Sequence, residues 1–251
     1  MAMTKIKTPS EIQAMRESGR MLARVLAKVA SQVSPGVNTQ YLANIARAEL
    51  KTLGGVPAFL GYHGFPDVLC VSVNDEVVHG IPSINCVIQE GDIVSLDFGV
   101  KYKGMITDSA LSVIAGKAKP KDKKLLIATE LSLQEGIARI KDGVRVGQIS
   151  AAIEAVLDKH GYGIVRDFVG HGVGHQLHEE PNIPNYGSAR SGPILKKGMT
   201  VAIEPMATLG RDSVFIEKDD WTVRTVDGSR AAHFEHTVLV TNNGVEIITT
   251  V

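Results

Sequence analysis

The chain has 251 residues, of which 44% are hydrophobic, and its 27 basic and 27 acidic residues leave no net charge. This length and composition fit one globular domain with a buried core, and the balanced charge excludes a general electrostatic attraction to nucleic acids or membrane surfaces. The first residues lack the apolar stretch of a signal peptide, and no later segment approaches about 18 consecutive apolar residues, so we expect a cytoplasmic protein without membrane contact.

Two helices are expected in the first part of the chain. Ser10 and Gln13 have the spacing of a capping box, and the apolar residues after them recur at helical spacing, which predicts a helix over about 10–31. After the turn sequence SPG, the segment NTQYLANIARAELKTLGG has apolar residues on one helical face and is expected to end at Gly54.

A second copy of this pattern follows later in the chain. The segments SPGVNTQYLANIARAELKTLGG and KDGVRVGQISAAIEAVLDKHGY align with Gly36 on Gly143, an offset of 107 residues. The segments EGDIVSLDFG and KGMTVAIEPM keep the same offset and place Asp97 on Glu204. Because two separate segments share one offset, we infer that the chain is internally duplicated.

The repeat predicts how the chain is organised. We expect one catalytic domain over residues 1–251, with halves of about 10–115 and 120–251 joined at the basic seam GKAKPKDKK, residues 116–124. Two halves of helix, helix, glycine-rich loop and strand indicate an α+β domain with one continuous sheet. A functional site is then expected on the pseudo-two-fold axis between the halves.

The expected strands at Asp97 and Glu204 are largely apolar, and each is interrupted by one carboxylate, which is costly in a core unless the charge is paired or binds a metal. The stretch from Asp97 to Asp108 reads as a hairpin, and a turn centred between Tyr102 and Lys103 would place the two aspartates directly opposite one another. Two carboxylates at that separation could chelate one cation. The alternative is a solvated hairpin face.

A last acid, Glu235, lies in AAHFEHTVLVT, an expected strand on which His233 shares its face. Four carboxylates with one or two imidazoles form an oxygen-rich set that suits divalent manganese, iron, cobalt or zinc. Thiolate ligands are excluded on the expectation that neither Cys70 nor Cys86 lies near these segments. Both thiols are expected to be buried and reduced.

Three histidines lie in GHGVGHQLHEEPNIP, residues 170–184. The glycines argue against a helix, so His171 and His175 are not a helical zinc pair, and in an extended loop one imidazole can bind metal while another meets substrate. A single histidine of this kind is more often structural. Convergence with the acids favours functional roles for His171 and His178, whereas His175 and the helix-terminal His160 are expected to be structural.

Six separated motifs resemble one known family. In order and spacing, NDEVVHGIP, SLDFG, TDSA, GHGVGHQLHEEP, AIEPM and HFEHTVLVT resemble the type I methionine aminopeptidases in their compact bacterial form, over nearly the whole chain. The resemblance implies the pita-bread fold, in which two pseudo-symmetric halves share a central antiparallel sheet covered by helices. It also implies metal-dependent removal of the N-terminal methionine from nascent proteins and peptides, with a preference for a small second residue.

The resemblance further implies ligands for two divalent metal ions, with Asp108 and Glu235 bridging the ions. The five implied ligands are Asp97, Asp108, His171, Glu204 and Glu235. Cobalt, manganese, iron, zinc and nickel are all candidates, since the sequence does not choose the physiological metal. His233 is an extra candidate ligand beside Glu235, although such neighbours more often hydrogen-bond to the ligands.

Two such ions would lower the pKa of a bridging water, and the resulting hydroxide would attack the scissile carbonyl. Glu204 is the candidate general base, His178 would stabilise the developing oxyanion, and His79 would hold the amide nitrogen side. One ion would also accept the free amine of the substrate, which explains why such a site trims chain ends.

An apolar pocket must supply the specificity. The segment PAFLGYHGFPDVLC and the single tryptophan offer Phe59, Tyr62, His63, Phe65, Cys70 and Trp221. Contacts between sulfur and aromatic rings favour a thioether side chain in such a pocket. The alternative is that these residues are ordinary core. Leu177 stands where the family commonly has an aromatic residue, which would alter the pocket wall.

Two other functions stay open at this point. A proline-specific aminopeptidase or dipeptidase would share the fold and metals, although such relatives usually carry an additional N-terminal domain. A catalytically inactive pita-bread protein that binds macromolecules would not need four carboxylates. The expected partners are the N-termini of nascent polypeptides. The basic seam could dock on the ribosome or simply be solvated, and nothing in the sequence demands more than a monomer.

Overall fold

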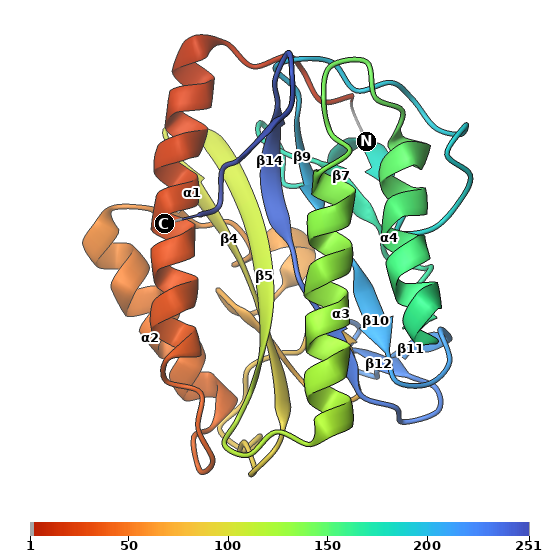
Figure 1. Ribbon diagram of the computed structural model, residues 1–251. Helices are drawn as coiled ribbons and strands as arrows, with labels where there is room; N and C mark the ends of the chain where they lie inside the picture. Colours follow the sequence, from red (N-terminus) through yellow and green to blue (C-terminus); the bar gives the residue numbers. More distant parts are fainter. Residues whose placement is uncertain (1–2, 251) are drawn as a thin grey trace.

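The computed structural model describes residues 3–250 and contains four α-helices in front of a layer of strands (Figure 1). The helices are α1 (Pro9–Ala30), α2 (Thr39–Leu53), α3 (Pro120–Ile137) and α4 (Val146–His160), and a short 3-10 turn, η1, spans Tyr62–Gly64. Across residues 3–250, no helix combines the length and the apolar character needed to cross a membrane.

The strands form four antiparallel sheets among the described residues. The first large sheet holds β1 (Val56–Pro57), β2 (Cys70–Val73), β4 (Ile93–Tyr102) and β5 (Met105–Ile114). The second, in the order β15-β14-β9-β7-β8, holds β7 (Gly170–Gly172), β8 (Glu179–Ile183), β9 (Thr200–Ile203), β14 (His236–Val240) and β15 (Val245–Ile247). One small sheet holds β6 (Gly163–Ile164), β10 (Met206–Thr208) and β13 (Ala231–His233). The other holds β3 (Glu76–Val78), β11 (Val214–Ile216) and β12 (Val223–Thr225).

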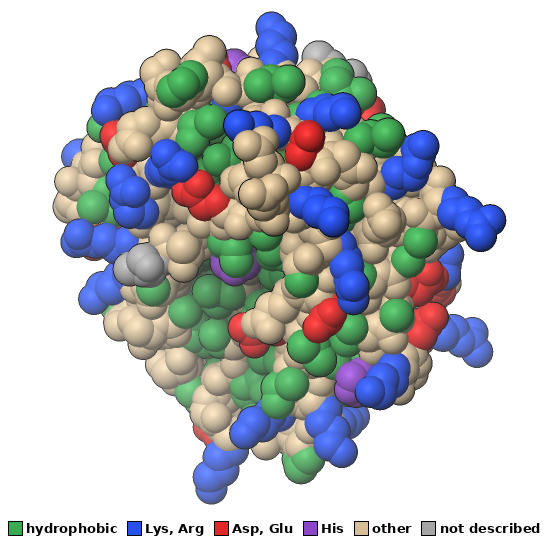
Figure 2. Space-filling model, turned by 45° about the horizontal axis from the view of Figure 1, so that its top comes forward, with side chains coloured by type: hydrophobic (Ala, Val, Ile, Leu, Met, Phe, Trp, Pro, Cys, Tyr) green, Lys and Arg blue, Asp and Glu red, His purple; other side chains and the backbone are tan. Residues whose placement is uncertain are grey.

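The helices cover one face of these sheets. α1 packs on β4 and β5, and α3 packs on α4, β10 and β13. A hollow between α1 and α3 has Leu26, Leu133 and Ile247 in its walls, and Figure 2 shows a hollow with hydrophobic walls on this side of the molecule. Leu96 and Phe98 of β4 belong to the core under α1 and α2, so Asp97 between them points to the opposite face of the sheet.

The first helix begins earlier than the sequence pattern suggested. The N-cap is Thr8, whose hydroxyl accepts a hydrogen bond from the backbone N–H of Glu11, while the Glu11 carboxylate accepts one from the N–H of Thr8. The predicted box of Ser10 and Gln13 is therefore wrong by two residues. Pro9 explains why Thr8 and not Ser10 is the N-cap, because proline fits the first turn of a helix and is tolerated there better than further inside.

Element boundaries in the two halves follow the offset of 107 residues. α2 and α4 begin at Thr39 and Val146, and both end at a glycine in the left-handed conformation, Gly54 with φ 78° and Gly161 with φ 71°. Such a helix end favours glycine because a side chain would be strained there. β4 and β9 also begin 107 residues apart.

The two large sheets meet at β5 and β14 without forming one ladder. The N–H of Glu235 donates to the carbonyl of Ala110 (2.8 Å), and the N–H of Asp108 donates to the Thr237 hydroxyl (2.9 Å). The expected single continuous sheet is instead divided, because the strands of the second half break at Glu204 and Glu235. Pro205, which has no N–H to donate, accounts for the first break.

The turn of the β4–β5 hairpin lies one residue later than predicted, which shifts the pairing of the strands by two residues. Asp97 pairs with Ala110 and Asp108 pairs with Gly99, because the turn lies at Lys103 and Gly104. Both turn residues have positive φ, as a two-residue hairpin turn of type I′ requires. The direct pairing of Asp97 with Asp108 is therefore wrong, but the two carboxylates are diagonal neighbours on one face.

Candidate active site

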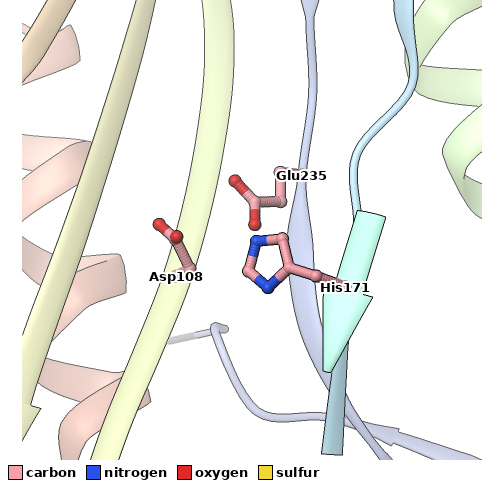
Figure 3. Close-up of side chains that lie close together, drawn as sticks. All are labelled: Asp108, His171 and Glu235. Carbon is pink, nitrogen blue, oxygen red and sulfur yellow. The ribbon is translucent and has the colours of Figure 1, made fainter. Parts of the chain in front are cut away.

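Three buried side chains from separate elements form the centre of the site (Figure 3). Asp108 comes from β5, His171 from the middle of β7, and Glu235 from the break between β13 and β14. One donor atom from each lies within 4.8 Å of the other two, and each residue is at most 4% exposed. The strand breaks thus turn a carboxylate of the second half toward an acid of the first.

Asp97 and Glu204 complete the cluster. Asp97 is the diagonal neighbour of Asp108 on the same face of the hairpin, and Glu204 lies in the break between β9 and β10. The carboxylate of Glu204 approaches the imidazole of His171, with Oε1 3.5 Å from Nε2. The structure therefore brings all five predicted ligands together.

The carboxylates of this cluster lack counter-charges. Asp97 Oδ1, Asp108 Oδ1 and Glu235 Oε1 are buried and have no hydrogen-bond partner within the described part of the chain. Burial and mutual repulsion raise the pKa of Asp108, Glu204 and Glu235 well above the usual range, and burial raises the pKa of Asp97 to about 7. A divalent cation would satisfy the oxygens and remove the repulsion, so the residues fit such an ion.

His171 is prepared for the same ion. Its Nδ1–H donates to the carbonyl of Gly172 (2.9 Å), which leaves the lone pair of Nε2 directed at the carboxylates. Burial lowers the pKa of His171 to about 3, so the ring is neutral at physiological pH. A neutral imidazole held by a hydrogen bond on its other nitrogen is the form that binds metals.

A cavity with apolar walls opens onto the acid cluster. It is lined by Phe59, Tyr62, Phe65, Cys70, His79, Asp97, Asp108, His171, Leu177, His178, Glu204, Trp221 and Glu235. The rings of Phe65 and Trp221 meet edge to face with centroids 5.1 Å apart. All five implied ligands and most of the predicted substrate residues therefore share one cavity, and Leu177 is part of its wall.

His178 and His79 lie between the acids and the aromatic wall. The Tyr62 hydroxyl is 2.8 Å from Nδ1 of His178, whose ring lies 4.3 Å from that of His171. Burial lowers the pKa of both His79 and His178 to about 4, so both rings are neutral. Burial also keeps the Tyr62 hydroxyl protonated by raising its pKa. The hydroxyl can thus donate to Nδ1, which leaves an N–H on Nε2 of His178.

Comparison with known proteins agrees with this geometry. Residues 13–242 match the family described as Metallopeptidase family M24. The chain belongs to metallopeptidase family M24. This M24 peptidase is 46% identical over 245 residues to methionine aminopeptidase 1 of Bacillus subtilis, with 98% of each chain covered. It is 40% identical over 245 residues to methionine aminopeptidase of Escherichia coli strain K12, with 97% of this chain and 93% of that one covered.

Solved structures agree as well. The M24 peptidase superposes on methionine aminopeptidase from Thermotoga maritima with a TM-score of 0.98 at 46% identity, covering 99% of this chain and 100% of that one. Prolidase from Pyrococcus furiosus matches with a TM-score of 0.79 at 22% identity, covering 98% of this chain and 65% of the prolidase, which shows a shared fold alone. The α+β pita-bread fold and the resemblance to type I methionine aminopeptidases are confirmed.

Two expectations about this M24 peptidase need correction. His63 is exposed and is not among the residues that line the cavity, and its ring packs edge to face against Tyr62. It still lies near the site, because its charge adds to burial in lowering the pKa of His178. Cys70 lies closer to the acids than expected, as the direct cross-strand neighbour of Asp97. Burial and the charge of Asp97 raise the pKa of the Cys70 thiol well above the usual range, so it stays protonated.

His175 and His160 of the M24 peptidase are placed by structural contacts. Nε2 of His175 donates to the carboxylate of Glu11 (2.8 Å), and Nδ1 of His160 contacts the carbonyl of Val156 (2.8 Å). Neither lines the cavity. Sequence reasoning missed Phe168, whose ring packs edge to face on His79 at 5.4 Å. No motif marks this residue, since a phenylalanine before a glycine-rich loop is also typical of ordinary core.

Proposed function

We propose that this chain is a metal-dependent aminopeptidase that releases the N-terminal methionine of polypeptides and prefers a small second residue. The observation that carries this proposal is one cavity in which an aromatic and apolar wall ends at the five predicted ligands, three of which have donor atoms close enough together to hold a metal ion. An unbranched thioether suits such a wall, because sulfur makes favourable contacts with aromatic rings. The relatives named methionine aminopeptidase support the same activity.

Asp97, Asp108, His171, Glu204 and Glu235 would hold two divalent ions, and cobalt, manganese, iron, zinc or nickel all suit this set of donors. When bound, the ions supply Lewis-acid polarisation of the scissile carbonyl and acidify water near neutral pH. The unpartnered carboxylate oxygens and the free lone pair of His171 support this assignment.

The remaining steps fall to side chains of this chain. Glu204 would take a proton from the attacking water and pass it to the leaving amine, as a carboxylate at the edge of the cluster. The Nε2–H of His178, set by Tyr62, would donate to the carbonyl oxygen as it gains negative charge. His79, packed against Phe168 and Trp221, would hold the amide nitrogen side.

The partners we propose are the N-termini of nascent chains, and the setting is the cytoplasm. We further propose a monomer with one catalytic domain over residues 1–251, in which about 10–115 and 120–251 are copies of one unit. The basic seam 116–124 is a candidate surface for docking near the ribosome. Its Asp122 does not add to such a surface, because it is buried and accepts a hydrogen bond from Arg230 (2.7 Å).

The experiment that tests the activity is methionine release from Met-Gly-Met-Met and Met-Leu-Met-Met by manganese-loaded protein. We expect rapid release from the first peptide and little from the second, because the larger leucine must enter the mouth of the cavity. Cleavage of peptides with proline in second position, with no methionine released, would move the protein to the proline-specific branch. If no peptide were cleaved although metal is bound, the result would favour a protein that binds macromolecules without catalysis.

A further inference from the structure

His233 is a buried polar side chain that the roles above leave unexplained. It ends β13 and is 1% exposed, and neither nitrogen of its ring has a hydrogen-bond partner among residues 3–250. Two buried polar atoms without partners are costly, so a native protein rarely leaves them in this state without a compensating interaction. His233 therefore calls for a partner close to its ring.

The backbone of His233 is held firmly. Its N–H donates to the hydroxyl of Ser112 (2.9 Å), and the same hydroxyl donates to its carbonyl (2.8 Å), which ties β13 to β5. The register of β13 on β10 places His233 opposite Met206, two residues beyond Glu204. The ring consequently reaches Glu204, with Nε2 3.7 Å from Oε2.

Glu204 thus lies between two imidazoles that differ in what they can donate. Its Oε1 faces Nε2 of His171, but the proton of that ring is on Nδ1, where it is donated to Gly172. The neutral His171 therefore has no proton to give to Glu204. His233 has no such restriction, because neither of its nitrogens is engaged elsewhere in the described chain.

We propose that His233 is a positioning residue for Glu204, with Nε2–H of His233 donating to Oε2 of the carboxylate. The observed 3.7 Å exceeds the usual length of about 2.7–3.2 Å, so a shift of less than about 1 Å closes the bond. The bond would hold Oε1 toward His171 and the cavity. Only its effect on turnover rests on the proposed function, since the bond and its effect on metal binding do not involve the substrate.

Two matched variants test this proposal. His233→Gln keeps a donor of similar reach, whereas His233→Leu keeps the bulk without a donor. We expect His233→Leu to lower kcat on Met-Gly-Met-Met and to weaken manganese binding, each by about 10–100-fold, as is usual when a residue that orients a ligand is removed. KM should change little, and His233→Gln should recover most of both losses. Wild-type behaviour of His233→Leu in both measurements would overturn the proposal.

The cobalt absorption spectrum separates positioning from direct ligation. At saturating cobalt, the bands of wild type and His233→Leu should coincide, because the number and type of ligands do not change. A shift of the bands would show that His233 is itself a ligand and would overturn the proposal.

Nitrogen NMR of the wild-type protein, loaded with zinc, decides the question even if His233→Leu does not fold. The proton of the His233 ring should lie on Nε2. A proton on Nδ1, or a metal bond at either nitrogen, would refute the assignment. If wild type released no methionine, the proposed function would fail, while the metal titration and both spectra would still decide the role of His233.

Discussion

Asp108 is linked to every other member of the acid cluster by proximity or by charge. It shares a common centre with His171 and Glu235, and the charges of Asp97 and Glu204 raise its pKa together with burial. Because metal catalysis contributes several kcal/mol, we expect Asp108→Ala to lower kcat/KM on Met-Gly-Met-Met at least about a thousandfold and to lose bound manganese. His160→Ala, far from the cavity, serves as the control. Near-normal turnover by metal-loaded Asp108→Ala would show that Asp108 is not a ligand shared by two metal ions.

The two histidines that flank Gln176 and Leu177 should behave differently. His178 lines the cavity, whereas His175 is partly exposed and donates to Glu11. His178→Ala should lower kcat about 100–1000-fold, as expected for the loss of an oxyanion donor. His175→Ala should leave kcat nearly unchanged, since an exposed pair contributes only about 0–1 kcal/mol to stability. Equal losses, measured side by side on the same peptide, would refute this distinction.

For single residues, the sequence predicts which side chains are functional candidates but not how each side chain is oriented. Buried carboxylates in apolar strands could be predicted, because charge in such strands needs a counter-ion. The direction of His63 could not, because it depends on a turn in which this residue adopts φ 47°. The proton position of His171 could not be predicted either, since it is set by the carbonyl of Gly172.

At the scale of elements, the segment before α1 is bonded to the loop that carries His171, His175 and His178. The N–H of Thr4 donates to the carbonyl of Glu180 (2.6 Å), and the ammonium of Lys7 lies 3.2 Å from the carboxylate of Glu179. The other oxygen of Glu179 accepts from the N–H groups of His175 and Gln176. The side chains of Lys7 and Glu179 are 0% and 4% exposed, so this ion pair is buried.

The buried ion pair of Lys7 and Glu179 predicts that a second substitution can offset the loss of stability caused by the first. Lys7→Met should destabilise the protein by about 3–5 kcal/mol, because it leaves the charge of Glu179 buried without a counter-ion. Adding Glu179→Gln should restore much of this loss, since the amide oxygen can still accept from the loop. Urea unfolding of both variants measures the difference. A double variant no more stable than Lys7→Met would show that the charge is not the cause.

Element boundaries were predictable where chemistry was specific. Gly54 ends its helix as predicted, and Gly161 ends α4 in the same way, because the left-handed position favours glycine. The start of α1 was misplaced because Thr8 and Ser10 both begin a capping pattern, and only Pro9 decides between them. The hairpin turn was misplaced by one residue, and the strand pairing therefore by two, because the turn residues, Lys103 and Gly104, are not a typical turn pair.

At the scale of the whole molecule, the acid cluster makes the stability of the metal-free protein depend on pH. The pKa of Asp97 is raised to about 7, and those of Asp108, Glu204 and Glu235 are also raised. A carboxyl with a raised folded pKa binds more protons in the folded state, so its contribution to stability is present at low pH and is lost as pH rises through the folded pKa.

These carboxyls should therefore lower the melting temperature of metal-free protein at pH 8 relative to pH 5.5, by roughly 5–10 °C if their contribution is a few kcal/mol. The buried histidines with lowered pKa act in the opposite sense. Manganese at 100 times its dissociation constant should add about 2.7 kcal/mol and remove most of the difference at pH 8. Asp108→Asn, with one charge fewer, should flatten the profile of the metal-free protein. The lowered pKa values of His79, His171 and His178 are common to both proteins, so the comparison isolates the carboxyls, and an Asp108→Asn profile as steep as that of wild type would contradict the proposed repulsion.

The positions of several elements were predictable from the repeat, but the contact between the two large sheets was not. One offset in the sequence anticipated the bounds of α2 and α4 and the start of β9. The contact between β5 and the segment around β14 joins residues far apart in the chain, and a pattern within each half carries no information about that contact.

The central claim is that the acid cluster binds divalent ions and that these ions are needed to release methionine. The most direct test titrates chelator-stripped protein with manganese and measures, in the same samples, bound metal by mass spectrometry and methionine released from Met-Gly-Met-Met. We expect no release without metal, and release that rises with bound manganese and levels off at no more than two ions per chain. Full release by the stripped protein, or two bound ions with no release, would contradict the claim.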